Sequence, residues 1–381
     1  MRGPPRSILS ELHYSRGVMI LEQVPLAQYT TLGVGGPARW FVETSREAEM
    51  LAAVRFARLR RVPYFILGGG SNLLVSDEGF PGVVIRITGT GSEWSDEGAG
   101  GGFARITVDA GAGWDSVVRL AVERNCAGIE CLAGIPGSVG GTPVQNVGAY
   151  GQEVSRTIVS VRALDLEAEK VVHFSAADCG FTYRRSIFNT THKGRYAITH
   201  VQYELKLDEP PHLAYRDVKQ YFVERGIAQP TLAETAAAVR IIRARKGMVL
   251  AADDPDSRSA GSFFKNPVVA VATVPSLAAI AGCRVDEVPQ YPPGAGFAPE
   301  GERVKISAAW LMELAGFRKG SSMGHPGLSS KHVLAIVNRG GSTAAEIVAL
   351  RDAVIQGVFA HTAVRLEQEP VMLGFAPMDP H

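Results

Sequence analysis

The chain has 381 residues, of which 46% are hydrophobic and 20% are charged. This composition lies outside the low-hydrophobicity, high-charge class of disordered proteins, and the length suits two or three domains with a ligand between them. The 39 basic and 38 acidic residues leave a net charge of +1. Such a balance excludes a global field that attracts nucleic acid or an anionic membrane, so any anion must be bound locally.

The four cysteines and nine histidines show none of the spacings of a zinc site or a disulfide framework. We therefore expect buried free thiols and no protein-bound metal. The stretch from Met1 to Arg16 lacks the apolar core of a secretion signal, and the chain has no run of about 18 apolar residues. The expected location is the cytoplasm.

The first part of the chain predicts a βαβ-like beginning. Trp40 to Val42 is typical of a strand, and a helix is expected over Ser45 to Arg60, with Ser45 as its cap and Glu47 in its first turn. Further strands are predicted at Val62 to Leu67, Val83 to Ile87 and Phe103 to Ala110. A second helix is predicted at Trp114 to Asn125, with a buried face of Val117, Val118, Leu120 and Ala121.

The second part of the chain predicts more strands and three helices. The strands are Ser160 to Leu166 and Tyr196 to Leu207. The clearest helix is Thr231 to Lys246, which opens with the capping pair Thr231 and Glu234 and has an apolar stripe of Leu232, Ala236, Val239 and Ile242. After a polar connection at Met248 to Ala260 come helices at Ala308 to Ala315 and Ala344 to His361, then an extended tail at Val364 to Leu373. The class is α+β, in three domains.

Two glycine-rich segments point to a bound ligand. Gly68-Gly69-Gly70 follows a predicted strand and precedes Ser71-Asn72, an arrangement suited to a phosphate or pyrophosphate. It is not the dinucleotide GxGxxG, because the next residues look extended rather than helical. The run from Gly128 to Gly151 is too apolar for a solvated loop and too rich in glycine for a helix or strand. Such a backbone can wrap closely around a flat ligand.

These segments and three later motifs resemble the UDP-N-acetylenolpyruvoylglucosamine reductases, the MurB family. ILGGGSNLLV (66–75) is similar to the family's FAD pyrophosphate loop, and GIPGSVGGTPVQNVGAYG (134–151) to its FAD-wrapping segment. FTYRRSIF (181–188), GSFFKNP (261–267) and LEQE (366–369) are similar to its three catalytic stretches. The motifs occur in the family's order, and the resemblance covers nearly the whole chain, from Leu26 to Gly374.

The resemblance implies an α+β fold with a two-part FAD-binding module of the vanillyl-alcohol-oxidase (PCMH-type) fold and an α/β substrate-binding domain. The implied parts are an N-terminal extension (1–18), FAD-binding subdomain 1 (19–91), FAD-binding subdomain 2 (92–246, with a C-terminal strand at 362–375) and the substrate-binding domain (247–361).

The resemblance also implies a flavoprotein oxidoreductase of peptidoglycan synthesis. NADPH would reduce FAD, and the reduced flavin would pass a hydride to the enolpyruvyl methylene of a UDP-sugar, giving UDP-N-acetylmuramate. The expected partners are the UDP-sugar and NADPH, with no nucleic acid and no membrane, and the expected state is a monomer.

Three residues match the family's catalytic positions. Hydride addition to an enol ether leaves negative charge on the inner carbon and the carboxylate. Arg184 offers a planar cationic fork suited to a carboxylate. Ser262 matches the proton donor, where position matters more than acidity because the carbanion is strongly basic. Glu369 must be protonated or shielded by Arg184 to avoid repelling the substrate, and Pro370 biases it to extended geometry.

The other candidates are assigned to the two ligands by the resemblance. Arg243 would face the flavin phosphates, Tyr215 would close over the substrate, and Lys246, Asn266 and Lys319 would bind the UDP group. Arg243 and Lys246 also lie at the end of a predicted helix, where the helix dipole favours cations even without a ligand. The cofactor-binding set is Gly68, Gly69, Gly70, Ser71, Asn72, Gly134, Ile135, Pro136, Gly137, Ser138, Gly140, Gly141, Gln145, Asn146, Gly148, Ala149 and Arg243. The substrate-binding set is Tyr183, Tyr215, Lys246, Asn266 and Lys319.

Two other functions stay open from the sequence. One is a flavin oxidase or dehydrogenase of the same fold, although those enzymes often tether FAD through a histidine that Gly68 to Leu74 lacks. The other is a binding protein that kept the loops and lost the chemistry. The joint presence of Arg184, Ser262 and Glu369 argues against it.

Overall fold

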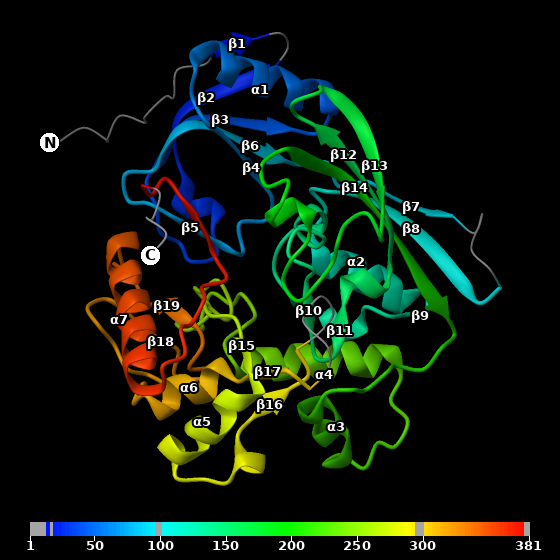
Figure 1. Cartoon of the computed structure of the whole chain (residues 1–381). Coiled ribbons are helices and arrows are strands. Elements are labelled where there is room, and N and C mark those ends of the chain that lie inside the picture. Colours follow the sequence, from blue (N-terminus) through cyan, green and yellow to red (C-terminus); the bar gives the residue numbers. More distant parts are fainter. Residues whose placement is uncertain (1–12, 16–17, 96–100, 294–300, 377–381) are drawn as a thin grey trace, which may run out of the picture.

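The structure is a computed structural model that describes residues 13–15, 18–95, 101–293 and 301–376. The expected N-terminal extension therefore lies mostly outside the described residues. Helices and strands are mixed along the chain, which confirms the predicted α+β class. Figure 1 shows a first sheet at the top, a second sheet to its right and a largely helical unit below. None of the helices in the described ranges has both the length and the apolar character that a membrane span needs.

The first sheet has strand order β1-β2-β3-β6-β4 and carries helix α1 on one face. Strands β3, β6 and β4 run parallel, and apolar side chains cover both of their faces, as buried parallel strands require. Loop 68–72 follows β4 at the carboxyl edge of this parallel part. The bounds are β1 (His13–Ser15), β2 (Val18–Pro25), β3 (Pro37–Thr44), α1 (Glu47–Arg60), β4 (Tyr64–Leu67), β5 (Leu73–Val75) and β6 (Phe80–Ile87).

The second sheet has the order β13-β12-β14-β8-β7, all antiparallel, with β9 also paired to β14. Helices α2 and α4 pack on it around Trp114 and Tyr203, which are fully buried. The bounds are β7 (Ser92–Ser95), β8 (Phe103–Asp109), α2 (Trp114–Glu123), β9 (Cys126–Ala127), β10 (Gly148–Ala149), β11 (Gln152–Glu153), β12 (Ile158–Asp165), β13 (Lys170–Ser175), β14 (Tyr196–Leu207), α3 (Arg216–Val223) and α4 (Leu232–Arg245).

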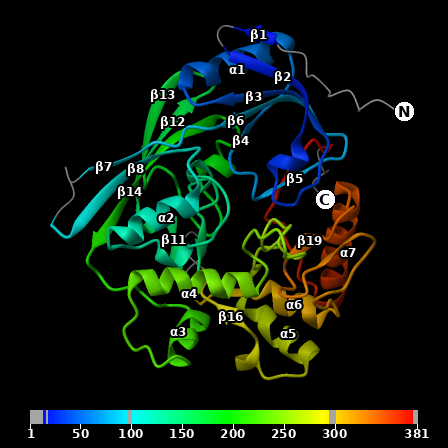
Figure 2. The same ribbon diagram turned by 180° about the vertical axis from the view of Figure 1, so that it is seen from behind.

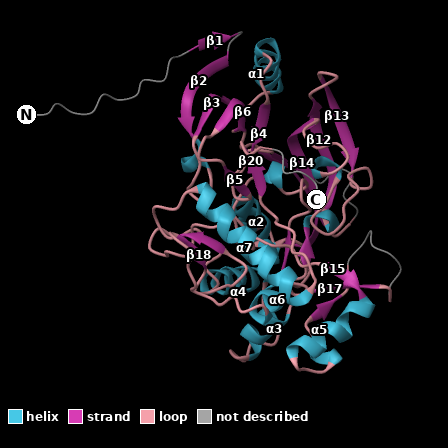
Figure 3. Cartoon of the chain, turned by 60° about the vertical axis from the view of Figure 1, so that its left-hand side comes forward, coloured by secondary structure: helices cyan, strands magenta, loops and turns pink. Residues whose placement is uncertain are grey.

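The third unit is built from three helices, a small sheet of order β15-β17-β16 and the hairpin β18-β19. Figures 2 and 3 show α5 and α6 in the lower half of the molecule and α7 reaching up from them toward β5. The bounds are β15 (Val268–Ala270), α5 (Val274–Ala281), β16 (Gln290–Tyr291), β17 (Arg303–Ile306), α6 (Ala308–Leu314), β18 (Pro326–Leu328), β19 (Ile336–Asn338) and α7 (Ala344–Thr362).

The last strand, β20 (Val371–Leu373), returns to the first unit. It pairs in parallel with β5 (Leu73–Val75), directly after the Gly68–Asn72 loop. The strand predicted within 362–375 therefore pairs with a strand of the first predicted FAD-binding subdomain (19–91). Parallel pairing needs a long crossover connection, and the chain from β6 through the second sheet and the third unit supplies it. Asp77 strengthens this junction, because its carboxylate accepts hydrogen bonds from the first amides of α7, Ala344 and Ala345.

The clearest predicted elements are confirmed, with small corrections. Helix α4 has the predicted cap, in which Thr231 and Glu234 bond each other's backbone amides. The cap of α1 is Arg46 and not Ser45, because Glu49 draws both amides toward its carboxylate. Leu120, expected on the buried face of α2, is 37% exposed. Of the four free cysteines, Cys126, Cys131 and Cys179 are buried and Cys283 is partly buried.

Candidate active site

The two glycine-rich segments lie against each other. A Cβ atom placed on Gly69 would come within 2.5 Å of Gly137 Cα, and one on Gly68 within 2.7 Å of Ser138 Oγ. Only residues without side chains allow this approach. Asn72 extends the junction, since its Nδ2 donates to Gln145 Oε1 at 2.5 Å and to the Glu369 carbonyl at 3.3 Å. The structure thus brings together the two segments predicted to hold FAD.

Several amides of the second segment are already occupied. The amide of Gly134 donates to Asp115 Oδ1 at 2.6 Å, that of Gly140 to the Ala110 carbonyl at 2.8 Å and that of Gly141 to the Ser138 carbonyl at 3.0 Å. These three amides are therefore not available to a phosphate. The Gly68–Asn72 loop is the better source of amide donors for a phosphate. The second segment contributes a surface against which the ligand can pack.

Two features of the second segment fit a bound flavin nucleotide. Ser138 Oγ is buried and has no hydrogen-bond partner among the residues that the structure describes, which leaves a donor for a ligand. Gly141 has open space where a Cβ would stand, with no protein atom within 4 Å. An unpartnered hydroxyl beside an open glycine surface is what a ligand with phosphates and a flat ring requires.

Gly141→Ala tests whether the flavin occupies that space. The added methyl meets no protein atom and the backbone angle is an ordinary one, so we expect unchanged folding. If FAD lies there, its affinity should fall about 10- to 100-fold, because overpacking a filled site is costly. The measurement is titration of the apoprotein with FAD, followed by flavin fluorescence.

The matched control for this variant is Gly140→Ala. Its methyl would stand 2.7 Å from Ala110 Cβ, so it should lower the melting temperature of the apoprotein, which Gly141→Ala should not. Gly69→Val would also lose FAD, but by pushing Gly137 away rather than by touching the ligand. Normal FAD affinity in Gly141→Ala would show that the flavin lies elsewhere.

The end of the second segment positions Arg184 rather than the cofactor. Arg184 Nη2 donates to the Gly148 carbonyl at 2.7 Å and Nη1 to the Asn146 carbonyl at 3.5 Å. The side chain of Asn146 is buried and used internally, by Glu153, Thr182 and the amide of Ser155. The expectation that Asn146 and Gly148 bind FAD therefore gains no support from their contacts, which instead hold the guanidinium.

Arg184 and Glu369 form the charged centre of the site. Arg184 Nε lies 3.3 Å from Glu369 Oε1, with both side chains largely buried. Within the described part of the chain, Nε is not aligned for a hydrogen bond to any acceptor. The backbone of Arg184 is in the left-handed region, with a φ of 58°, a conformation that is common at functional sites. Asn189 Nδ2 donates a hydrogen bond to the Arg184 carbonyl. The pair places Arg184 where one of the two predicted arrangements, shielding of Glu369, requires it.

Ser262 is placed by a backbone ladder that also carries Glu369. The amide of Phe263 donates to the Leu334 carbonyl, and the amide of Glu369 donates to the Phe263 carbonyl, each at 2.8 Å. Pro370 is compatible with this ladder, because the donor needed is the amide of Glu369 itself. The proton-donor and glutamate segments, more than a hundred residues apart, are thus hydrogen-bonded neighbours.

Tyr183 and Lys305 lie beside this centre. Lys305 Nζ stands 4.3 Å above the Tyr183 ring centre, and the Arg184 guanidinium lies 5.3 Å from it. Burial raises the pKa of Tyr183 and lowers the pKa of Lys305. The sequence analysis missed Lys305. The only signal in the sequence was a lysine between Val304 and Ile306 on β17. The same alternation of polar and apolar residues is typical of a strand with one face in solvent.

Two of the predicted substrate-binding residues, Lys246 and Tyr215, lie near the end of α4. Lys246 Nζ pairs with Asp217 Oδ2 at 2.6 Å and lies 5.7 Å from the Tyr150 ring centre. Tyr215 packs edge-on against Tyr150 at 5.4 Å and is 41% exposed. Burial alone would lower the pKa of Lys246, but the ion pair with Asp217 outweighs it and the pKa is raised. Lys246 is therefore a cation that lies close to Tyr150 and Tyr215.

The remaining predicted residues fall in two groups. Arg243 is buried and donates to the carbonyls of Gly134 and Met248, so it anchors the glycine segment from behind instead of pointing into a phosphate site. Asn266 Oδ1 accepts the amide of Ala308 at the start of α6, which leaves its Nδ2 for a ligand. Lys319 is exposed, and its charge acts on His332.

Two cavities lie near these residues. One of about 230 Å³ is lined by Ala110, the partner of Gly140, and by the start of α1, His200 and Arg162. Another of about 400 Å³ lies between α3 and α4 and includes Asp217 and Lys246. Among the residues that the structure describes, no three His, Cys, Asp or Glu side chains are grouped to hold a metal.

Known proteins with the same features were found by sequence and by structure. Residues 38–175 match the family model for an FAD binding domain, and residues 253–373 match that for the C-terminal domain of UDP-N-acetylenolpyruvoylglucosamine reductase. The reductase of that name from Thermobifida fusca is 45% identical over 359 residues, which cover 92% of this chain and 97% of the relative. The one from Streptomyces coelicolor is 42% identical over 368 residues, with 94% and 91% covered.

The chain is also similar to a solved structure, the UDP-N-acetylenolpyruvylglucosamine reductase (MurB) from Thermus caldophilus. The TM-score is 0.59 at 26% identity, covering 94% of this chain and 100% of that one. The first family model contains loop 68–72 and segment 134–151, and the second contains Ser262 and Glu369. The predicted fold, an FAD-binding module with a separate substrate-binding domain, is confirmed by these matches.

Proposed function

The chain belongs to the UDP-N-acetylenolpyruvoylglucosamine reductase family, and on that premise we propose that it reduces UDP-N-acetylglucosamine enolpyruvate to UDP-N-acetylmuramate with FAD and NADPH. The product is a precursor of peptidoglycan. The observation that carries the proposal is the arrangement of Arg184, Glu369 and Ser262, in which the first two pair at 3.3 Å and the last two share one backbone ladder.

FAD would be held between the two glycine-rich segments. The Gly68–Asn72 loop would offer amides to the pyrophosphate, and Ser138 Oγ, which is unpartnered in the described part of the chain, would donate to the same ligand. Bound FAD supplies the hydride for the enolpyruvyl methylene. The protein holds the two glycine-rich segments together through the hydrogen bond of Asn72 to Gln145 and the contact of Gly69 with Gly137.

Arg184 stabilises the negative charge that hydride addition leaves on the substrate carboxylate. Its guanidinium is already oriented by the Gly148 carbonyl and by Glu369, so little reorganisation is needed when the charge develops. Tyr183 and Lys305 flank it, and the lysine adds a second positive charge to the same side of the site. Glu369 and Glu153 are the carboxylates beside these two cations, so the substrate carboxylate must compete with them for Arg184 and Lys305.

Ser262 completes the reaction by protonating the inner carbon. The Oγ–H bond breaks, its proton forms the new C–H bond, and the serine oxygen regains a proton from water. The rigid ladder around Phe263 holds the hydroxyl in place, which is what a weak acid needs in order to act on a strongly basic carbanion.

The UDP group would lie along Lys246, Asn266, Lys319 and Tyr215. Lys246 is paired with Asp217 in the ligand-free chain, so a diphosphate must compete with that carboxylate. Tyr215 starts α3 and rests on Tyr150, from where it can cover a bound diphosphate. We further propose a cytoplasmic monomer, with the predicted domain limits kept except for the reassigned last strand.

The flavin spectrum of the purified protein tests this function. We expect a yellow protein whose colour is released by denaturation, because FAD is held noncovalently. NADPH should bleach the flavin band under anaerobic conditions, and UDP-N-acetylglucosamine enolpyruvate should restore it. An alcohol or lactone that restores the band in place of the sugar would instead indicate an oxidase or dehydrogenase of the same fold.

A further inference from the structure

His332 lies beside the proposed proton donor, in the turn between β18 and β19. Its Nε2 is 3.4 Å from Ser262 Oγ. We propose that His332 is a positioning residue, which donates its Nε2 hydrogen to Ser262 Oγ, directs the serine proton toward the substrate and stabilises the oxygen once that proton has left. This inference rests on the proposed function, because it concerns the step in which Ser262 acts.

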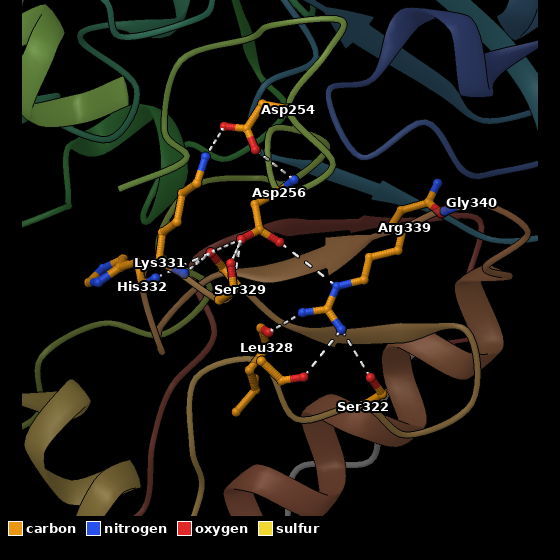
Figure 4. Close-up of polar contacts among 12 residues, drawn as sticks. Asp254, Asp256, Ser322, Leu328, Ser329, Lys331, His332, Arg339 and Gly340 are labelled. Atoms are coloured by element: carbon orange, nitrogen blue, oxygen red, sulfur yellow. Dashed lines mark hydrogen bonds and ion pairs between the residues drawn. The ribbon is translucent and has the colours of Figure 1, made fainter. Parts of the chain in front are cut away.

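The turn that carries His332 is fixed by a buried carboxylate. Asp256 Oδ2 accepts hydrogen bonds from Ser330 Oγ at 2.6 Å, the Ser330 amide at 2.8 Å and Ser329 Oγ at 3.1 Å. Ser329 Oγ in turn accepts the amide of His332 at 3.2 Å. Burial alone would raise the pKa of Asp256, but these bonds outweigh it and the pKa is lowered, so the anchor stays charged. Figure 4 shows this network.

Two further charges brace the same turn. Arg339 lies 3.8 Å from Asp256 Oδ1 and donates to the Leu328 carbonyl at 2.8 Å, at the end of β18. Lys331 pairs with Asp254 at 2.7 Å, pointing away from His332 (Figure 4). The residues on both sides of His332 are therefore held, and its ring has a fixed place.

Ser262 is held just as firmly on the other side. Phe263 is bonded through its amide to Leu334, two residues after His332, so the two segments cannot shift independently. Gly261 has a φ of 75°, which lets the chain turn into this ladder just before Ser262. The distance between Oγ and Nε2 is thus set by the fold and not by two mobile side chains.

His332 is neutral under physiological conditions. Burial, with Lys246 and Lys319 as the charges that act on it, lowers the pKa of His332 to about 4. On its own turn Lys331 is neutralised by Asp254, and Asp256 is occupied by its hydrogen bonds. A neutral imidazole has one N–H. If Nε2 were the acceptor, the serine proton would point at the ring and away from the substrate, so proton donation requires hydrogen on Nε2.

Ser262 loses and regains one proton in this step, and His332 only donates a hydrogen bond. The serine O–H bond breaks, a C–H bond forms on the substrate, and the serine oxygen is left negative while Nε2–H donates to it. Water returns the proton to the oxygen, and His332 stays neutral throughout. A hydrogen bond to a charged group is stronger than one to a neutral group, so this contact favours the state after proton loss.

The kinetic test is a double-mutant cycle with Ser262→Ala and His332→Leu, followed by rapid-mixing absorbance of the flavin. His332→Leu should slow reoxidation by the enolpyruvyl sugar about 10- to 100-fold, the usual worth of one hydrogen bond to a charged group. His332→Gln keeps an N–H donor and should recover most of the rate. In the Ser262→Ala background, His332→Leu should change little, because the group it acts on is absent.

Independent effects of the two substitutions would overturn the proposal, since His332 would then act on the substrate directly. The second readout needs no turnover. Nitrogen NMR of histidine-labelled holoenzyme should show His332 as the Nε2–H tautomer, with its Nε2 signal shifted by Ser262→Ala. A Nδ1–H tautomer also overturns it. If the parent enzyme is not reoxidised by the sugar, the proposed function fails, while the NMR result still decides the hydrogen bond.

Discussion

Ser262→Ala is expected to slow reoxidation of the reduced flavin by UDP-N-acetylglucosamine enolpyruvate by about 10²–10⁴-fold, the usual worth of a positioned general acid. Flavin reduction by NADPH should stay close to normal, because that step takes no proton from this hydroxyl. The backbone ladder does not depend on the serine side chain, so the fold should be retained. Rapid-mixing absorbance of the flavin in each half-reaction separates the two effects.

Ser262→Cys is the informative partner of this variant. A thiol can also donate a proton, so part of the lost rate should return, although the larger sulfur cannot occupy quite the same place. If Ser262→Ala reoxidises as fast as the parent enzyme, the serine is not the acid. A bound water or Glu369 would then supply the proton.

Arg184→Gln should lower the rate of the same half-reaction by about 10²–10³-fold, because it removes the charge aimed at the developing anion. The effect should appear in kcat more than in KM, since the contact strengthens as charge develops. Glu369 would also lose its partner at 3.3 Å and remain largely buried. FAD content must be measured alongside, because Arg184 bonds the Gly148 carbonyl of the glycine segment.

Arg185→Gln is the matched control, one residue along the chain. Arg185 is about half exposed, and its nearest carboxylate is Glu367 at 3.9 Å. Exposed ion pairs of this kind contribute little to stability. The reoxidation rate of Arg185→Gln should therefore stay within about threefold of the parent rate. Equal losses in Arg184→Gln and Arg185→Gln would mean that the whole loop, and not one guanidinium, supports the reaction.

Local signals in the sequence were enough for the elements with strong periodicity and caps. Helix α4 begins at the predicted capping pair, and β14 has the predicted bounds, Tyr196–Leu207. Helices α3 and α5 were missed, because each has only eight residues and no strong cap. The sequence did not show where the last strand pairs, since pairing of β20 with β5 joins residues nearly three hundred positions apart.

In the site, too, the local motifs could be predicted from the sequence but the contacts between distant segments could not. The sequence by itself determined the motifs, because glycine runs and an FTYRR or GSFFKNP stretch are continuous in the chain and their chemistry can be read locally. It could not show that Asn146 and Gly148 hold Arg184, or that His332 reaches Ser262. These contacts join segments 36 to 70 residues apart through single hydrogen bonds. Only the packing within the second and third units brings such groups within reach, so only the tertiary structure decided them.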